Sequence, residues 1–410
     1  MPMNRLHKVL SGEVAAMDEK GTRKGLEDVI THVMPASGGA GPRYRLAAEG
    51  DKLFIKMNSN SYLGLCLHPD VREAEEKAVR RFGVGPGAVR FISGTYITHV
   101  DLEKRLAAFH GRESGMIFSS AYIATLGVLV PLTSPETLLV SDELNHNCII
   151  NAMRLSRPAA KKVYKHLDMD ALKGILRDAT GHYRRVIVVT DGVFSMRGDH
   201  APLDMISGIC REFDGQFPEN VVLVVDDSHG VGAFGASGRG TEEITAAQGV
   251  DILVATLGKA LGVNGGYVVG SRVLMDYLRE TAPMYIYSNP ITPAEAAAAL
   301  RALEILDSPE GVALVESLQA RTRRFRQGLV KAGYETLPGE HPVVPLMVRD
   351  TSRTRALVHH LKRRGVLATG LAYPVVPRGD EEIRFQINAD HTDADIDEVL
   401  EILGAARTRT

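Results

Sequence analysis

The sequence contains no tryptophan, only three cysteines and no long apolar run. Cys66, Cys148 and Cys210 lie far apart and form no C-x-x-C pair. This spacing excludes a disulfide framework and favours a reducing compartment, so we expect a cytoplasmic protein. No stretch approaches the roughly 20 uninterrupted apolar residues that a membrane helix needs. The first 20 residues lack an apolar core and include acidic side chains, which argues against a secretory signal.

An excess of charge of one sign is also missing, because 48 Lys and Arg residues balance 50 Asp and Glu residues to a net charge of −2. A near-neutral chain lacks the basic surface that nucleic-acid binding requires. We therefore expect no nucleic-acid partner, no membrane partner and no metal site. Apolar residues make up 44% and charged residues 24% of the 410 positions. These proportions are typical of a soluble globular protein, either with two domains or with one large domain and appendages.

Short apolar runs rich in β-branched residues alternate with helical patterns in the middle of the chain. We predict buried strands at 138–142, 186–192, 221–227, 251–256 and 267–271. Strands separated by helices indicate an α/β fold with a mainly parallel sheet covered on both faces. Several of the runs end in polar or glycine-rich sequence, at the edge where open α/β sheets bind their ligands.

The regions before and after these runs predict further elements. We expect an amphipathic helix over 1–20, a loop over 35–50, a helix from about 68 to Gly83 and another before Gly111. After a composition change near 285–300, we predict helices at 293–306 and 311–333, strands at 345–348 and 383–387, and a last helix that starts at Thr392 and is capped by Asp395. The predicted parts are an N-terminal helix and arm (1–50), a large α/β domain (51–290) and a smaller α+β domain (291–410).

A glycine motif offers one interpretation of the function. Gly230, Gly232 and Gly235 have the G-x-G-x-x-G spacing of nicotinamide-binding proteins and follow a predicted strand. That mechanism needs the third glycine to lie in a helix whose amino terminus faces the pyrophosphate. The following ASGRG is turn sequence, and the residues at 226–229 are polar. A NAD-dependent oxidoreductase therefore stays a remote alternative.

A lysine after the fourth predicted strand offers another interpretation of the function. Lys259 lies in the string TLGKALG directly after the apolar run DILVAT, where it is either a solvated loop residue or an amine held at the ligand edge. A buried lysine there would have a lowered pKa and could form a Schiff base. Thr256 offers a hydroxyl for a phosphate. Asp226 at the end of the preceding strand could pair with a protonated pyridine nitrogen, and His229 could bond a ring oxygen.

Other polar residues fall at similar positions. Ser120, Ala121 and Tyr122 begin a predicted helix, whose free N–H groups would suit an anion. His146 follows a strand and could stack on a flat ring. Arg384, in a strand of the small domain, could clamp a carboxylate, although a plain salt bridge explains it as well. Each residue taken alone has a structural explanation.

Together these strings resemble the α-oxoamine synthases, which are pyridoxal-phosphate enzymes of fold type I. The strings are NSNSYLGL (58–65), VRFISGT (89–95), DGVFSMRG (191–198), VVDDSHGVG (224–232), TLGKALG (256–262) and YSNP (287–290). The resemblance spans about residues 50–400 and is strongest to the glycine C-acetyltransferase branch, through SDELNHN (141–147), Val89 and the string at 372–392. It implies a large domain with a mainly parallel seven-stranded sheet and a smaller C-terminal α+β domain.

The resemblance also implies a role for each residue. Lys259 would hold pyridoxal 5'-phosphate covalently, Asp226 would pair with its ring nitrogen, His146 would stack on the ring, and Ser195 and His229 would bond its phenolic oxygen. Catalytic roles are expected for Lys259, His146, Asp226 and His229. The phosphate would be bound by Ser120, Ala121, Tyr122 and Thr256, and by Ser288 and Asn289 of a neighbouring subunit, so a homodimer with shared active sites is expected. Asn60, His146 and Arg384 would bind the amino acid.

Three features depart from the family pattern. Arg197 stands where an acidic residue is usual, Pro290 replaces a serine or threonine, and the loop at 213–222 is longer. They leave the cofactor chemistry intact but leave the substrates open. The resemblance implies that glycine and acetyl-CoA form 2-amino-3-oxobutanoate and CoA. A sibling enzyme that uses alanine or serine with a longer acyl-CoA and releases CO2 is the nearest alternative, and a non-enzymatic binding or regulatory module is a remote one.

Overall fold

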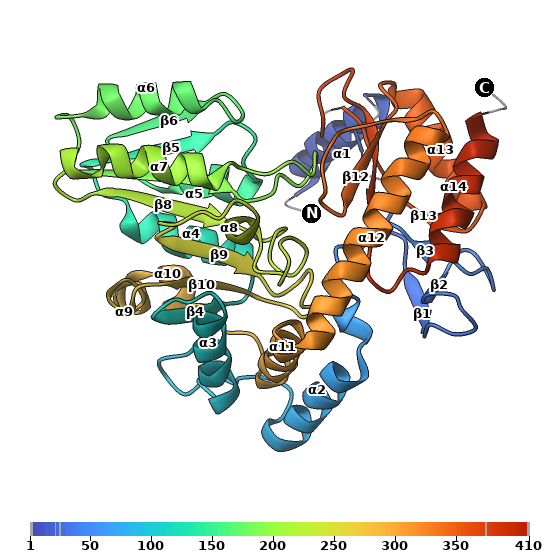
Figure 1. The fold of residues 1–410 in the computed structure, drawn as a ribbon, viewed down its shortest axis with the longest axis horizontal. Coiled ribbons are helices and arrows are strands. Elements are labelled where there is room, and N and C mark those ends of the chain that lie inside the picture. The colour runs from blue at the N-terminus through green and yellow to red at the C-terminus, as the bar shows by residue number, and fades with distance from the viewer. Residues whose placement is uncertain (1–2, 21, 24–25, 374, 408–410) are drawn as a thin grey trace.

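The computed structural model describes residues 3–20, 22–23, 26–373 and 375–407. Within these ranges the largest sheet has seven strands in the order β4-β10-β9-β8-β7-β5-β6 (Figure 1). They are β4 (Ser114–Phe118), β5 (Thr137–Asp142), β6 (Ala160–Tyr164), β7 (Arg185–Asp191), β8 (Val221–Asp226), β9 (Ile252–Thr256) and β10 (Gly266–Gly270). The pairings from β6 through β5, β7 and β8 to β9 are parallel, whereas β10 is antiparallel to β9 and β4. The predicted α/β fold with a mainly parallel sheet is confirmed.

Alternating side chains explain why both faces of this sheet are covered. In β7, Val186 and Val188 pack into one apolar cluster, and Ile187 and Val189 pack into another. The first cluster includes residues of α3 (Ile97–Phe109), α6 (Met169–Ala179) and α7 (Leu203–Phe213), and the second includes residues of α4 (Ala121–Leu132), α5 (Asn147–Leu155) and α9 (Arg272–Thr281). Because both faces are buried, the strand is apolar at successive positions.

The five predicted strands agree with the structure to within one residue at each end. Two strands of the same sheet were not predicted. β4 contains an apolar run that we did not assign to a strand, and β6 lies at the edge of the sheet with Lys161, Lys162 and Val163 exposed. An exposed edge strand has no apolar periodicity, so the sequence offered no signal for β6.

The C-terminal part is built on a smaller antiparallel sheet. Its order is β11-β12-β15-β14, with β11 (Glu335–Thr336), β12 (Val343–Met347), β15 (Glu382–Gln386) and β14 (Thr369–Leu371). The long helix α12 (Pro309–Lys331), α13 (Thr351–Arg363) and α14 (Asp393–Arg407) pack beside it (Figure 1). The predicted cap of the last helix is confirmed, since Thr392 N donates to Asp395 Oδ2 at 2.7 Å and Asp395 N donates to Thr392 Oγ1 at 3.2 Å.

Helices α2 (Pro69–Phe82) and α11 (Pro293–Leu306) pack against each other. Both were predicted, as was α1 (Asn4–Glu19). The short helices are α8 (Thr241–Ile244), α10 (Pro283–Ile286) and two 3-10 turns, Leu65–Leu67 and Asp214–Gln216. In the described part of the chain, no helix has both the length and the apolar character needed to cross a bilayer.

The prediction of a loop over 35–50 is wrong in part. β2 (Arg43–Leu46) lies within it and pairs antiparallel with β1 (Ile30–Met34). Gly41 N and the Arg43 guanidinium both bind the Asp395 carboxylate, at 2.9 and 2.5 Å. These contacts are more than 350 residues apart in the chain, so local turn residues could not reveal them. β3 (Ile55–Lys56) likewise pairs with β13 (Val366–Leu367), and the three domain limits stay a prediction.

Candidate active site

A cavity of about 240 Å³ lies at the carboxyl ends of the strands of the large sheet. Side chains reach it from the segments that follow β4, β5, β7, β8 and β9. Its lining residues are Ser120, Ala121, Tyr122, His146, Cys148, Asp191, Val193, Ser195, Asp226, Ser228, His229, Thr256 and Lys259. Most of the residues predicted for a cofactor site are therefore brought together at the edge that open α/β sheets use.

Lys259 lies in the turn after β9. Thr256 stabilises this turn, because its hydroxyl accepts a hydrogen bond from Gly258 N at 3.0 Å and lies 3.1 Å from the Gly265 carbonyl oxygen. Removal from water lowers the pKa of the Lys259 ammonium from 10.5 to about 8, and the nearby Asp226 and Asp191 oppose this shift. About a tenth of the lysine is then a neutral, nucleophilic amine at pH 7, far more than at its ordinary pKa.

Asp226 and Asp191 end neighbouring strands and lie opposite each other in register. Oδ2 of Asp226 lies 3.2 Å from the Thr125 hydroxyl and 3.5 Å from Cys148 Sγ, and Oδ1 accepts from Ser228 N at 3.2 Å. Burial, followed by repulsion from Asp226, raises the pKa of Asp191 well above its usual value. Burial and the neighbouring Asp226 therefore favour the protonated form of Asp191.

Two histidines line the cavity. His146 caps α5, where Nδ1 accepts from Cys148 N at 3.2 Å, and its own backbone N–H donates to Asp191 at 2.9 Å. Burial lowers the pKa of His146 and lowers that of His229 well below 6.5, with repulsion from Lys259 adding to the shift at His229. Both rings are therefore neutral at physiological pH, and a neutral imidazole can stack or donate one hydrogen bond.

The start of α4 lines the cavity through Ser120, Ala121 and Tyr122. Ser120 caps the helix and accepts from Ile123 N at 3.2 Å. β10 approaches this helix so closely that a Cβ at Gly266 would lie 2.1 Å from Ala121 N. Only glycine fits at that approach, which keeps the first-turn N–H groups clear of side chains. Free N–H groups at a helix start attract an anion such as a phosphate.

Arg384 reaches the site from β15 of the smaller sheet. Its Nη1 donates to the Ser195 carbonyl oxygen at 3.0 Å, and its Nε is buried without a partner. Among the residues that the structure describes, no carboxylate lies within ion-pair distance of this guanidinium. The salt-bridge explanation therefore fails for Arg384. Asn60 joins the same strand through Gln386, whose Nε2 donates to Asn60 Oδ1 at 2.8 Å.

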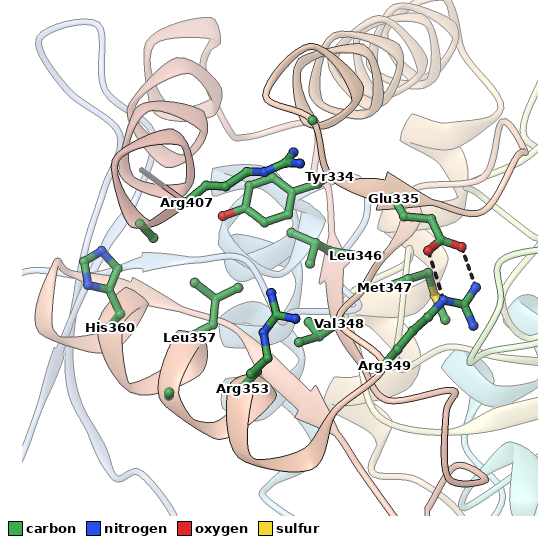
Figure 2. Close-up of a pocket in the computed structure, with 13 residues that line it drawn as sticks. Tyr334, Glu335, Leu346, Met347, Val348, Arg349, Arg353, Leu357, His360 and Arg407 are labelled. Atoms are coloured by element: carbon green, nitrogen blue, oxygen red, sulfur yellow. Dashed lines mark hydrogen bonds and ion pairs between the residues drawn. The ribbon is translucent and has the colours of Figure 1, made fainter. Parts of the chain in front are cut away.

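A second cavity, of about 410 Å³, lies in the C-terminal part between the turn after α12, β11, β12, α13 and the end of α14. Figure 2 shows Leu346, Val348 and Leu357 facing it, with Arg349 paired to Glu335 at its rim. None of its described lining residues is a lysine, cysteine, serine, threonine or aspartate. It therefore lacks the nucleophile and the clustered carboxylates of the smaller cavity.

The sequence from 52 to 403 matches the family model for class I and II aminotransferases. The chain is 38% identical to 8-amino-7-oxononanoate synthase 1 of Bacillus velezensis over 97% of both proteins. It is also 38% identical to human mitochondrial 2-amino-3-ketobutyrate coenzyme A ligase, over 97% of this chain and 91% of the human protein. This chain belongs to the α-oxoamine synthases. Serine palmitoyltransferase of Sphingomonas wittichii has the same fold, with a TM-score of 0.88, 25% identity and coverage of 99% and 98% of the two chains.

Enzymes of this family use pyridoxal phosphate, and the residues of the smaller cavity fit that group. A partly neutral lysine, a buried carboxylate that forms no ion pair with a described arginine or lysine, two neutral imidazoles and a helix start cleared by Gly266 surround one space. They match an aldehyde, a pyridine nitrogen, a flat ring and a phosphate. Ser288 and Asn289 do not line this cavity, and their predicted contact with a second subunit stays a prediction.

The glycine motif has a structural explanation that sequence reasoning missed. Asp227 is buried and accepts hydrogen bonds from Thr241 N and Oγ1, both at 2.6 Å. A Cβ at Gly230 or Gly240 would lie 2.1 Å from its carboxylate. Residues 230–235 form turns and bends, and no helix starts at Gly235. The glycine motif is therefore not a dinucleotide-binding motif.

Four further lining residues were not predicted as site residues: Cys148, Asp191, Val193 and Ser228. Asp191 begins the string DGVFSMRG, and Cys148 directly follows SDELNHN. An aspartate at the end of a strand and an isolated cysteine give little indication of a functional site on their own. Ser228 follows Asp226, and its Oγ is buried without a partner in the described structure. Arg197, the family departure, forms an ion pair of 2.9 Å with Asp199. Its charge is therefore partly compensated within its own loop.

His166 connects the loop of Ser195 to the sheet. Its Nδ1 lies 3.0 Å from Asp142 Oδ1 and its Nε2 lies 3.3 Å from Asp199 Oδ2, while the ring packs edge-on against Phe194. Burial opposes a charge on this ring, but the bonds to Asp142 and Asp199 outweigh it and raise the pKa of His166 from 6.5 to about 9. The ring is therefore an imidazolium at neutral pH.

Replacing His166 by asparagine is expected to remove a pH-dependent contribution to stability. Because the pKa of His166 is higher in the folded protein than in the unfolded chain, the contribution is complete below pH 6.5 and is lost as the pH rises to about 9. After allowance for solvent screening it is on the order of 2 kcal/mol. Urea unfolding at about pH 6 and about pH 9.5 should show a larger loss in the wild type than in the variant. An equal loss would contradict the charge assigned to His166.

Proposed function

We propose that this chain catalyses the condensation of glycine with acetyl-CoA to 2-amino-3-oxobutanoate and CoA. The observation that carries the proposal is that Lys259, an amine with a lowered pKa, and the buried Asp226 carboxylate line one cavity. Arg384 lies outside this lining but binds the carbonyl of Ser195, which belongs to it, and forms no ion pair with a described carboxylate. Bound pyridoxal phosphate supplies an electron-withdrawing ring next to the α-carbon of the amino acid.

The proposed roles follow from where the side chains lie. Lys259 would hold the cofactor covalently, and its free amine would take the α-proton of glycine. Asp226 would pair with the ring nitrogen. Thr125 and Cys148 keep the Asp226 carboxylate in place by contacting the same oxygen atom. The α-carbon then forms a bond to the thioester carbonyl carbon, the C–S bond breaks, and the thiolate of CoA takes up a proton.

The remaining predicted residues bind and orient. Ser195 and His229 are proposed to contact the phenolic oxygen, and His146 to stack on the ring. The phosphate is proposed to lie at the start of α4 among Ser120, Ala121, Tyr122 and Thr256. Arg384 and Asn60, linked through Gln386, are proposed to hold the carboxylate of the amino acid.

A second candidate deserves the same assay, because the chain is equally identical to a synthase of 8-amino-7-oxononanoate and to a ligase of 2-amino-3-ketobutyrate. The test follows release of free CoA from acetyl-CoA and from longer acyl-CoAs, with glycine, alanine or serine in turn. Release with glycine and acetyl-CoA alone, without CO2, supports the proposal. Release of CoA and CO2 from alanine with a longer acyl-CoA would assign the chain to the decarboxylating branch instead.

We also propose a homodimer with shared active sites. Phe91, Ile92 and Tyr287 are 64%, 64% and 77% exposed. The two segments adjoin, since the Arg90 guanidinium lies 5.6 Å from the centre of the Tyr285 ring. A cluster of exposed large apolar side chains indicates a contact with another protein surface. Within this cluster, Tyr287 directly precedes Ser288 and Asn289, the residues proposed to complete the site of a second subunit.

Replacing Phe91 by glutamate is expected to separate the subunits and to reduce activity at the same time. A charge buried at a subunit contact disfavours association, and each site would lose the partner's Ser288 and Asn289. Sedimentation at several protein concentrations, paired with the CoA-release assay, measures both effects. Val330→Glu is the control, since Val330 is also 59% exposed but lies on α12. A wild-type chain that sediments as a monomer with full activity would contradict the shared site.

A further inference from the structure

His229 is held by two residues that belong to neither the predicted site nor the cavity lining. The Tyr62 hydroxyl lies 2.7 Å from His229 Nδ1, and His341 Nε2 lies 2.9 Å from the His229 carbonyl oxygen. Tyr62 and His341 are fully buried, and their rings meet edge-on at 5.5 Å. Tyr62 follows β3, His229 follows β8 and His341 precedes β12, so three distant segments meet at this point.

The protonation of His341 follows from its partners. Its Nδ1 accepts a hydrogen bond from Val343 N at 3.1 Å, so Nδ1 carries no proton. A carbonyl oxygen can only accept, and therefore Nε2–H of His341 donates to the His229 backbone. Burial lowers the pKa of His341 to about 3. His341 is thus a neutral side chain with one fixed tautomer, and it fixes the backbone position of His229.

Tyr62 acts on the ring of the same residue. Burial raises the pKa of Tyr62 well above its usual value, so its hydroxyl keeps its proton and can donate. When it donates to Nδ1, the imidazole proton of neutral His229 must lie on Nε2. Nε2 has no partner among the residues that the structure describes, and His229 lines the cavity. The free donor is therefore available to a ligand there.

We propose that Tyr62 and His341 are positioning residues that fix His229 with its proton on Nε2, as a hydrogen-bond donor to the phenolic oxygen of the cofactor. The inference rests on the proposed function, because it concerns the contact that His229 makes in that function. Tyr62 sets the tautomer and His341 sets the backbone position. His341 precedes β12 and bonds to Val343 N, so the smaller sheet contributes to the position of His229.

Tyr62→Phe tests the tautomer with the loss of a single oxygen atom. We expect kcat to fall roughly tenfold, the size of one lost hydrogen bond, with little change in the KM for the amino acid. The visible absorption maximum of the bound cofactor should shift, because the tautomer of His229 that donates to its phenolic oxygen is no longer fixed by Tyr62. A purely structural role would change stability and leave this absorption maximum in place.

Tyr267→Phe is the matched control. Tyr267 and His110 form another buried tyrosine–histidine pair, 2.8 Å from hydroxyl to Nε2, and neither residue lines the cavity. This variant loses an equivalent hydrogen bond and should keep the wild-type spectrum and kcat. An unshifted spectrum with kcat within twofold of the control would overturn the role of Tyr62.

His341 provides a second test that does not depend on Tyr62→Phe folding. His341→Gln retains an N–H that can reach the His229 carbonyl, whereas His341→Ala does not. We expect the glutamine variant to restore the wild-type absorption maximum and most of kcat, and the alanine variant to behave like Tyr62→Phe. Equal spectra in the two variants would overturn the role of His341. A wild-type protein with no lysine-dependent absorption would instead refute the proposed function itself.

Discussion

Replacing Lys259 by alanine is expected to lower turnover by roughly 10²–10⁴-fold or more, since this one amine is proposed to serve as both the covalent anchor and the general base. Lys259 is suited to both roles, because it is the lysine that lines the described cavity and its pKa is lowered to about 8. The measurement is CoA release under saturating substrates, together with the visible absorption of the purified protein. Both should be lost.

Two variants make the result specific. Lys259→Arg keeps a positive charge at this position but cannot form a Schiff base, so it should be as inactive as the alanine variant. Lys165→Ala removes an exposed lysine that pairs with Glu143 and should leave both readouts intact. Activity in Lys259→Ala above about one tenth of wild type would exclude the proposed mechanism.

Much of the fold could be predicted because the large sheet is buried on both faces. The strands that end at Asp191, Asp226 and Thr256 are continuous apolar runs, and each is followed by polar residues at the edge where ligands bind. Chain order alone therefore placed Asp226, Thr256 and Lys259 near one another. The capping pattern at Thr392 was readable for a similar reason, since a cap depends on residues three positions apart.

The rest depended on contacts between distant segments. The segment 35–50 forms β2 because its neighbours include β1 and Asp395, which local sequence does not show. Gly230 makes room for the Asp227 carboxylate and not for a pyrophosphate. This close approach can be seen only in the folded turn. The contact of Tyr62 and His341 with His229 joins three parts of the chain. Apolar periodicity reports burial on one element, and it carries no information about which polar groups meet.

Replacing Arg384 by alanine is expected to raise the KM for the amino acid about ten- to hundredfold, with a smaller effect on the KM for acyl-CoA. A charge-assisted hydrogen bond is worth about 1.5–3 kcal/mol, which corresponds to a change of this size. The nitrogens of Arg384 differ in their partners. Nη1 donates to the Ser195 carbonyl oxygen, whereas Nε is buried without a partner among the described residues. A half-buried guanidinium that forms no ion pair with a described carboxylate is suited to a carboxylate that arrives with the substrate.

The conservative and distant variants separate this role from a general effect of charge. Arg384→Lys retains the charge but loses the planar fork, so its KM should lie between those of the wild type and the alanine variant. Arg324→Ala removes an exposed arginine that already binds Asp397 through two nitrogens and should leave KM unchanged. If Arg384→Ala instead lowered kcat at an unchanged KM, the arginine would act mainly by holding the Ser195 loop. The amino acid carboxylate would then bind elsewhere, with Asn60 as the next residue to replace.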